Sequence, residues 1–76
     1  MFHYIDFDPK VLGGKPHIRG TRLSVEFILE LIASGATREE ILKTYPQLTA
    51  KALEEVLKYA AQAVKNEILL DVKVGA

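Results

Sequence analysis

The stretch TREEILKTYPQLT, residues 37–49, decides how the middle of this chain folds. Thr37 followed by Glu40 forms the pattern of a capping box, in which each side chain accepts a hydrogen bond from the other residue's backbone N–H, so a helix begins here. This helix must end just before Pro46, because proline disfavours the helical conformation of the residue that precedes it. Thr49 is a good N-cap for the next helix. The stretch therefore predicts a short helix, a tight turn and a second helix.

A helix is also expected on the N-terminal side of this stretch, over residues 25–34. Ser24 is a good N-cap, Glu26 lies in the first turn where the helix dipole favours an anion, and Gly35 supplies a left-handed stop. The apolar residues of the segment recur with helical spacing and predict the face that packs on the core. They are Val25, Ile28, Leu29 and Ile32.

The helix that begins after Thr49 is expected to be the longest. Its apolar stripe, which we expect to face the core, consists of Leu53, Val56, Leu57, Ala60, Val64 and Ile68. Its solvated stripe consists of Lys51, Glu55, Lys58, Gln62 and Lys65. Beyond residue 67 apolar and charged residues alternate, in the order Leu70, Asp71, Val72, Lys73 and Val74. That period is typical of a half-buried strand and predicts that the segment 67–76 leaves the helix.

The N-terminal part of the chain carries the signals of a β element. Residues 2–7 are rich in aromatic and β-branched residues and are stopped by Pro9, which predicts a short strand with apolar side chains on both faces. The segment 17–25 offers a second strand around Ile18 and Leu23. The fold class is therefore mainly α with a short β element: a three-helix helix-turn-helix core beside an N-terminal β-hairpin or strand. We expect a single domain, 1–76, made of the strand and loop of 1–23, the helical core of 24–66 and the tail of 67–76.

Size and composition predict that the protein pairs with a copy of itself. The chain has 76 residues and no cysteine, which excludes disulfides, and its two histidines do not make up a structural zinc site. We expect neither a metal nor a cofactor. A lone core of this size supplies only about 3–5 kcal/mol. Because residues 2–7 have two apolar faces, we expect a homodimer that buries this strand.

The side chains assemble no catalytic set. His17 has no nucleophile near it in the sequence, so acid–base and nucleophilic catalysis lack their components. The acidic residues Asp6, Asp8, Glu39 and Glu40 are better explained as solvated caps. The run Gly-Gly-Lys of residues 13–15 lacks the spacing of a nucleotide-binding loop. We therefore expect no enzyme and no small-molecule substrate.

The sequence also predicts a cytoplasmic protein. No apolar run approaches the roughly 18 residues that a membrane span needs. The start Met-Phe-His-Tyr-Ile-Asp lacks the cationic and apolar parts of a signal sequence. We expect no contact with a membrane.

Positive charge is concentrated around the stretch GGKPHIRGTR, residues 13–22. From residue 9 to residue 25 there are four cations and no acid, although the whole chain has ten basic and ten acidic residues. The cations are Lys10, Lys15, Arg19 and Arg22. Cations beside glycines, whose N–H groups approach an anion closely, suit a phosphate or an acidic partner surface. The alternative is a solvated turn between two short strands.

A helix, a tight turn and a second helix are the parts of a helix-turn-helix, whose second helix lies in the DNA major groove. Here that helix presents Thr49 and Lys51 first, whereas Glu54 and Glu55 repel DNA if they face it. A helical hairpin that binds no DNA is the alternative. The residues that we expect at DNA are Lys15, Arg19, Thr21, Arg22, Lys43, Gln47, Thr49, Lys51 and Lys58.

The run GKPHIRGTR of residues 14–22, with Glu39-Glu40-Ile41 and Tyr45-Pro46, resembles the small family numbered 433 among the domains of unknown function. The likeness covers about residues 4–61. It implies an antitoxin-like protein of the VapB type, encoded beside a PIN-like nuclease toxin, whose helix-turn-helix binds the promoter of its own operon. It also implies a signature loop made of Lys15, Arg19, Thr21 and Arg22.

Two functions are left by these observations. The first is the antitoxin of a type II toxin–antitoxin system, a homodimer that neutralises a PIN-like toxin protein and binds its own promoter DNA. The second is a protein-interaction adaptor whose helical hairpin binds no DNA. In the first, an extended tail contacts the partner through Ile68, Leu70, Val72 and Val74. The alternative for this tail is a strand that folds back on the chain's own sheet.

Overall fold

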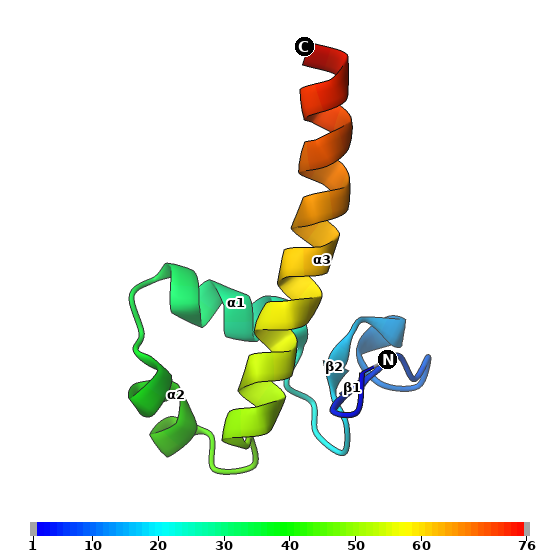
Figure 1. The fold of residues 1–76 in the computed structure, drawn as a ribbon. Coiled ribbons are helices and arrows are strands. Elements are labelled where there is room, and N and C mark those ends of the chain that lie inside the picture. The colour runs from blue at the N-terminus through cyan, green and yellow to red at the C-terminus, as the bar shows by residue number, and fades with distance from the viewer. Residues whose placement is uncertain (1, 76) are drawn as a thin grey trace.

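The computed structural model describes the backbone of residues 2–75 and the side chains of residues 2–65. Within these residues a short antiparallel hairpin precedes three α-helices, so the mainly helical fold class is confirmed (Figure 1). The elements are β1 (Ile5–Asp6), the 3-10 turn η1 (Leu12–Gly14), β2 (His17–Ile18), α1 (Val25–Ala33), α2 (Arg38–Thr44) and α3 (Ala50–Gly75). None of the described helices is long and apolar enough to cross a membrane.

The helices begin at the N-caps that the sequence predicts. The Ser24 hydroxyl accepts a hydrogen bond from the third backbone N–H of α1. At α2 both bonds of the capping box are present, since Thr37 Oγ1 accepts from the Glu40 N–H and Glu40 Oε1 accepts from the Thr37 N–H. These bonds from the Thr37 backbone and side chain hold the pKa of Glu40 below its ordinary value. Thr49 Oγ1 accepts an N–H bond in the first turn of α3.

The core lies where α2, the turn and α3 close on α1. Ile28 of α1, Ile41 of α2 and Leu48 of the turn are almost fully buried, together with Leu53 and Val56 of α3. Burying such side chains contributes about 1.5–3 kcal/mol each. Because every segment of the α2–turn–α3 unit supplies at least one of them, its geometry is fixed by packing.

The β element is shorter than the sequence predicts. β1 and β2 pair antiparallel with Ile5 opposite Ile18, so the expected pairing is confirmed, but each strand has only two residues. Strands over residues 2–7 and 17–25 were therefore predicted too long. Asp6 Oδ1 and Asp8 Oδ1 accept bonds from the N–H groups of Phe7 and Lys10, which bends the chain out of the ladder.

The signature run Gly-Thr-Arg builds a tight turn after β2. Gly20 has φ +79°, a left-handed conformation that favours glycine. The Thr21 hydroxyl donates to the Ile18 carbonyl and accepts from the Leu23 N–H. The Ile18 N–H in turn donates to the Leu23 carbonyl. The turn is thus held closed by its own residues.

Helix α3 does not stop at residue 67. It continues to Gly75, so the predicted extended tail is wrong, both as a partner-binding strand and as a strand folded back on the sheet. Once a helix has formed, each added residue costs little, and the segment holds no proline and no glycine before Gly75. The side chains expected at a partner lie outside the described ones: Ile68, Leu70, Val72 and Val74.

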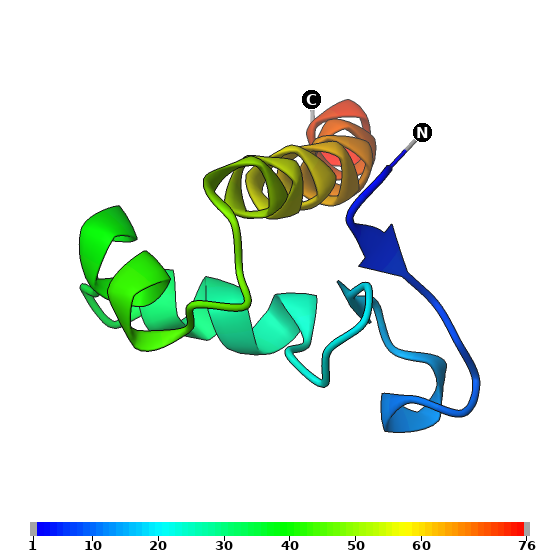
Figure 2. The same cartoon turned by 90° about the horizontal axis from the view of Figure 1, so that it is seen from below.

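The apolar stripe of α3 is only partly in the core. Leu57 and Val64 were expected to face it, but 45% and 49% of their surfaces are exposed. Glu55, expected on the solvated stripe, is half-buried instead. The reason is visible in Figures 1 and 2: α1 crosses the first half of α3 and spans from the hairpin to α2, while the second half of α3 projects beyond the other elements.

Candidate nucleic-acid interface

The start of α3 presents polar side chains to solvent because its apolar side chains are buried in the core. Leu48 in the turn is buried, whereas Gln47, Thr49 and Lys51 on either side of it are exposed. An exposed, polar first turn preceded by a short helix is the arrangement in which a recognition helix contacts DNA. The short helix, the turn and the longer helix that the sequence predicts from residue 37 onward are therefore present.

The signature turn lies at the same end of the molecule as the start of α3. Figure 1 shows the turn of residues 19–23, in cyan, and the turn before α3 at the end opposite the C-terminus. Arg19 and Arg22 are exposed on the signature turn. Two separate elements thus carry cations at one end of a chain whose formal net charge is zero.

A carboxylate on α3 ties the hairpin to the helix. Glu55 Oε1 accepts hydrogen bonds from the backbone N–H groups of Tyr4, at 2.6 Å, and Ile5, at 3.2 Å. On the other side of this strand, the Tyr4 carbonyl accepts from the Arg19 N–H. Helix α3, β1 and the start of the signature turn are therefore joined by consecutive hydrogen bonds.

These bonds favour the ionised form of Glu55. Partial burial by itself raises the pKa of this carboxyl group. The backbone N–H groups of Tyr4, His3 and Ile5 and the charge of a protonated His3 act in the opposite direction and outweigh the burial. The pKa of Glu55 consequently lies below its ordinary value, and the carboxylate is charged at neutral pH.

Beside this contact a polar groove runs between the N-terminal arm and α3. Its lysines are Lys51 and Lys58, and its other lining residues are Phe2, His3, Tyr4, Glu54, Glu55 and Gln62. Glu54 is paired with Arg38 of α2 at 3.3 Å, with about half of each side chain exposed. The predicted repulsion between α3 acids and DNA is thereby reduced, because one acid is neutralised by an arginine and the other faces β1.

The structure does not bring all the predicted DNA-binding residues together. Lys15 lies beside the start of α1, where its ammonium is 3.5 Å from the Glu26 carboxylate. The guanidinium of Arg19 is 3.8 Å from Asp6. The hydroxyl of Thr21 is used inside the signature turn. Exposed ion pairs of this kind contribute little to stability, so the two cations exchange partners easily.

The remaining predicted residues lie on α2, at the start of α3 and on the signature turn. Lys51 and Lys58 line the groove on α3, and Gln47 and Thr49 lie just before it. Lys43 is exposed in the last turn of α2. Arg22 is exposed on the signature turn and makes no ion pair within the described side chains. The start of α3 and the signature turn together form the candidate interface.

His17 has a structural role. Only 2% of its surface is exposed, and its Nδ1 lies 2.9 Å from the Lys15 carbonyl oxygen. Residues 2–65, whose side chains the structure describes, contain no cluster of histidines and acids that could hold a metal ion. The imidazole therefore fixes the loop between η1 and β2.

Sequence reasoning missed Glu55, Tyr4 and His3 as parts of this region. Glu55 and Tyr4 are 51 positions apart, and no local pattern relates a helical carboxylate to a distant strand end. The available signal was the charge itself, because an acidic residue on a helix that is expected to contact DNA indicates that its carboxylate binds another group. The sequence likewise does not predict the pairing of Arg38 with Glu54, because the two residues lie on different helices.

Comparison with known proteins shows the family of this chain. A family model described as "Protein of unknown function (DUF433)" matches residues 5–60. The uncharacterized protein y4eO of Sinorhizobium fredii is 36% identical over 52 residues, which is 68% of this chain. The chain spans only about a quarter of that relative, 24% of its length. A crystal structure of a DUF433 member from Anabaena variabilis is 33% identical, with a TM-score of 0.75, and the match covers 96% of this chain and 69% of that one.

We expect Glu55 to stabilise the fold in a pH-dependent way. Replacing it by alanine leaves two N–H groups without their acceptor, so the free energy of unfolding at pH 7 should fall by about 1–2 kcal/mol. Because the folded-state pKa is lowered, the carboxylate contribution is full above the unfolded-state pKa and is lost as pH falls through the folded value. Urea unfolding should therefore show wild type as more stable than Glu55→Gln at pH 7, with a difference that shrinks as pH falls below the ordinary pKa of a glutamate.

Glu54→Gln is the matched control for this experiment. It removes the same charge one residue earlier on α3, at a position that is half-exposed. Its free energy of unfolding should change little at either pH. Equal effects of the two substitutions at all pH values would show that the Glu55 contact is not specific.

Proposed function

This chain belongs to the DUF433 family of proteins of unknown function, and we propose that it is the antitoxin-like, DNA-binding component of a toxin–antitoxin pair. In this role it binds the promoter of its own operon through the helix-turn-helix and neutralises a PIN-like nuclease in the cytoplasm. It performs no catalysis and needs no cofactor. The runner-up is an adaptor that binds protein alone.

One observation carries the DNA-binding part of the proposal. The exposed first turn of α3 and the signature turn lie at one end of the molecule and both carry cations, Lys51 on the first and Arg19 and Arg22 on the second. A recognition helix flanked by a second basic element is a common way to hold a helix in the major groove, because the flanking element contacts phosphates.

The Glu55 contact supports the same proposal. Phosphate contacts position a protein only if the cations that make them keep a fixed spacing. The hydrogen bonds from Glu55 to the Tyr4 and Ile5 N–H groups hold the hairpin, and with it the signature turn, at a fixed place on α3. The two basic elements then act as one surface.

Charge limits the affinity that one copy reaches. The chain has ten basic and ten acidic residues, so long-range attraction to DNA is absent and only the local surface contributes. We therefore expect weak binding by one copy and strong dependence on salt. Two copies on adjacent half-sites would add their contacts.

The adaptor function is favoured by a different surface. Leu57 and Val64 expose apolar area on the middle of α3, at positions where an exposed helix surface normally carries polar residues. A helix that lays an apolar face into a partner's groove is a common mode of protein recognition. In the antitoxin the end of α3, beyond residue 66, is the segment that meets the nuclease.

We expect Lys51→Glu to weaken binding to a duplex taken from the region upstream of the protein's own reading frame. Loss of one phosphate contact should reduce the slope of log affinity against log salt by about 1, and Arg22→Ala should do the same. The control is Lys10→Glu, which makes the same charge change in the loop before η1. Mobility-shift titrations at several salt concentrations give the slopes.

The outcomes separate the two functions. If Lys51→Glu and Arg22→Ala both bind as wild type does, this surface does not contact DNA. If wild type itself binds no duplex at low salt, the adaptor function replaces the antitoxin function.

Neutralisation of the nuclease is tested by co-expression with the product of the adjacent reading frame. A chain that ends at Asn66 retains the described core, so it should stay folded by circular dichroism. If the end of α3 holds the toxin, this shortened chain should no longer protect cells from the nuclease. Full protection by the shortened chain would place the contact elsewhere, and an adjacent frame that encodes no nuclease would favour the adaptor.

A further inference from the structure

The middle of α3 has an apolar face that the other described side chains leave partly uncovered. Leu57, Ala61 and Val64 follow the helical spacing i, i+4, i+7 and so lie on one face. The side chains of Leu57 and Val64 are about half exposed. We call the exposed apolar face formed by Leu57, Ala61 and Val64 the ridge.

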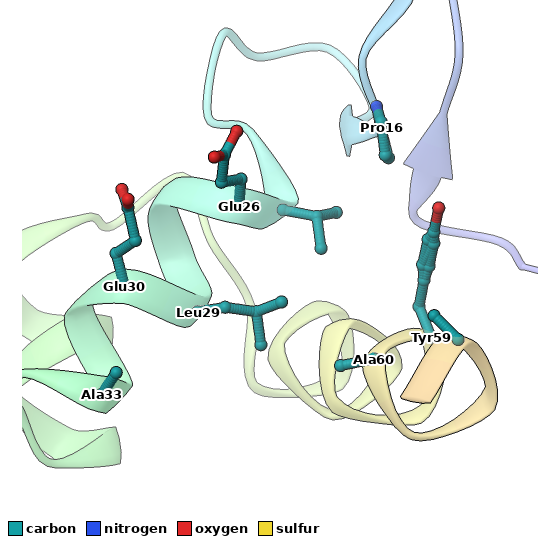
Figure 3. A pocket seen from close by; sticks show the side chains of 9 residues that line it. Pro16, Glu26, Leu29, Glu30, Ala33, Tyr59 and Ala60 are labelled. Carbon is teal, nitrogen blue, oxygen red and sulfur yellow. The ribbon is translucent and has the colours of Figure 1, made fainter. Parts of the chain in front are cut away.

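Next to this ridge lies an apolar groove between α1 and α3 (Figure 3). Its floor is made of small or aliphatic side chains, Leu29 and Ala33 from α1 and Ala60 and Ala63 from α3. Figure 3 shows Pro16 and Tyr59 at the end away from Ala33, and Val25 also lines the groove. Small side chains let another helix approach closely, because no bulk holds the two backbones apart.

Charge distinguishes the ridge from the groove. Glu26 and Glu30 stand on the α1 rim of the groove, and Figure 3 shows their carboxylates pointing outward. Glu26 is 3.5 Å from Lys15 of the same chain, so Glu30 is the rim carboxylate that the ion pairs among the described side chains leave for a partner. Lys58 and Lys65, both exposed, follow Leu57 and Val64 directly in the sequence, so the ridge is bordered by lysines. A basic-edged apolar ridge fits an acidic-edged apolar groove.

We propose that the groove between α1 and α3 receives the α3 ridge of a second copy of this chain. The contact is reciprocal, since each copy supplies one ridge and one groove, as a two-fold dimer requires. Both uncovered apolar surfaces are buried by one partner. The acidic rim of each copy then faces the lysines of the other.

This interface replaces the one that the sequence alone suggests. The N-terminal segment 2–7 was expected to bury its apolar faces against a copy. In the structure the rings of Phe2 and Phe7 pack edge-on against Tyr59 of the same chain, with ring centres 5.4 and 6.1 Å away. Part of that aromatic surface is therefore already covered, whereas the ridge is not.

Substitution at Val64 tests the ridge. A carboxylate in the middle of a buried apolar contact should raise the dissociation constant of the dimer about tenfold or more, which corresponds to about 1.4 kcal/mol. Val64→Asp should then sediment as a monomer at low micromolar concentration, where wild type is a dimer. Since Val64 is half-exposed in a single copy, the variant should keep its helical circular dichroism.

Gln62→Asp is the matched control, because Gln62 lines the polar groove on another face of the same helix. It should remain dimeric. A monomeric wild type at micromolar concentration, a dimeric Val64→Asp, or equal dissociation by both variants would each overturn the proposal. None of these measurements involves DNA or a nuclease, so their outcome is independent of the proposed function.

A charge exchange tests which groove the ridge enters. Glu30→Lys and Lys65→Glu should each weaken the homodimer, because each places like charges together at both contacts. In an equimolar mixture the two variants should form a heterodimer, because both of its contacts then pair opposite charges. At one contact the lysine rim of the first variant meets the glutamate beside the ridge of the second, and at the other contact the original glutamate rim meets the original lysine. Native mass spectrometry distinguishes the species, and a mixture that shows no preference for the heterodimer contradicts this docking.

Discussion

The structure depends on the hydrogen bonds between the Glu55 carboxylate and the N–H groups of Tyr4 and Ile5. The hairpin is too short to be stable alone, since each strand has only two residues. Its strand end would also expose unpaired N–H groups. One side chain of α3 satisfies both groups and adds a charge-assisted bond that is stronger than a neutral one. The N-terminal part of the chain is therefore held by a helix that begins more than forty residues later.

Local signals in the sequence predict the helix starts, because a cap is a contact between residues three positions apart. The hydroxyls of Ser24, Thr37 and Thr49 each accept a hydrogen bond from the backbone N–H three residues later. The paired strands also follow from composition, but their length does not, since Asp6 and Asp8 compete for the N–H groups of the ladder. Competition of this kind depends on geometry that no residue pattern contains.

The candidate site is predicted less well than the fold. The exposed start of α3 follows from the caps and from the buried Leu48. The contact of Glu55 with Tyr4 and the pairing of Arg38 with Glu54 join distant segments, and both change the electrostatics of the surface. At the end of α3 a local pattern was present but predicted the wrong structure. Alternation beyond residue 67 indicated a strand, but an existing helix extends at little cost when no proline interrupts it.

Helix α3 carries both proposed surfaces, the DNA-binding one at its first turn and the dimer ridge at its middle, and this has a mechanical consequence. A continuous helix from Ala50 to Gly75 transmits orientation as a rod, because its backbone hydrogen bonds resist bending. If the ridge pairs with a second copy, the angle of that pairing sets the distance between the two exposed first turns. The spacing of DNA half-sites would then be determined by the apolar ridge and groove, far from any base contact. Residues that never touch DNA, such as Val64 and Ala60, would in that case constrain which operators the protein can bind.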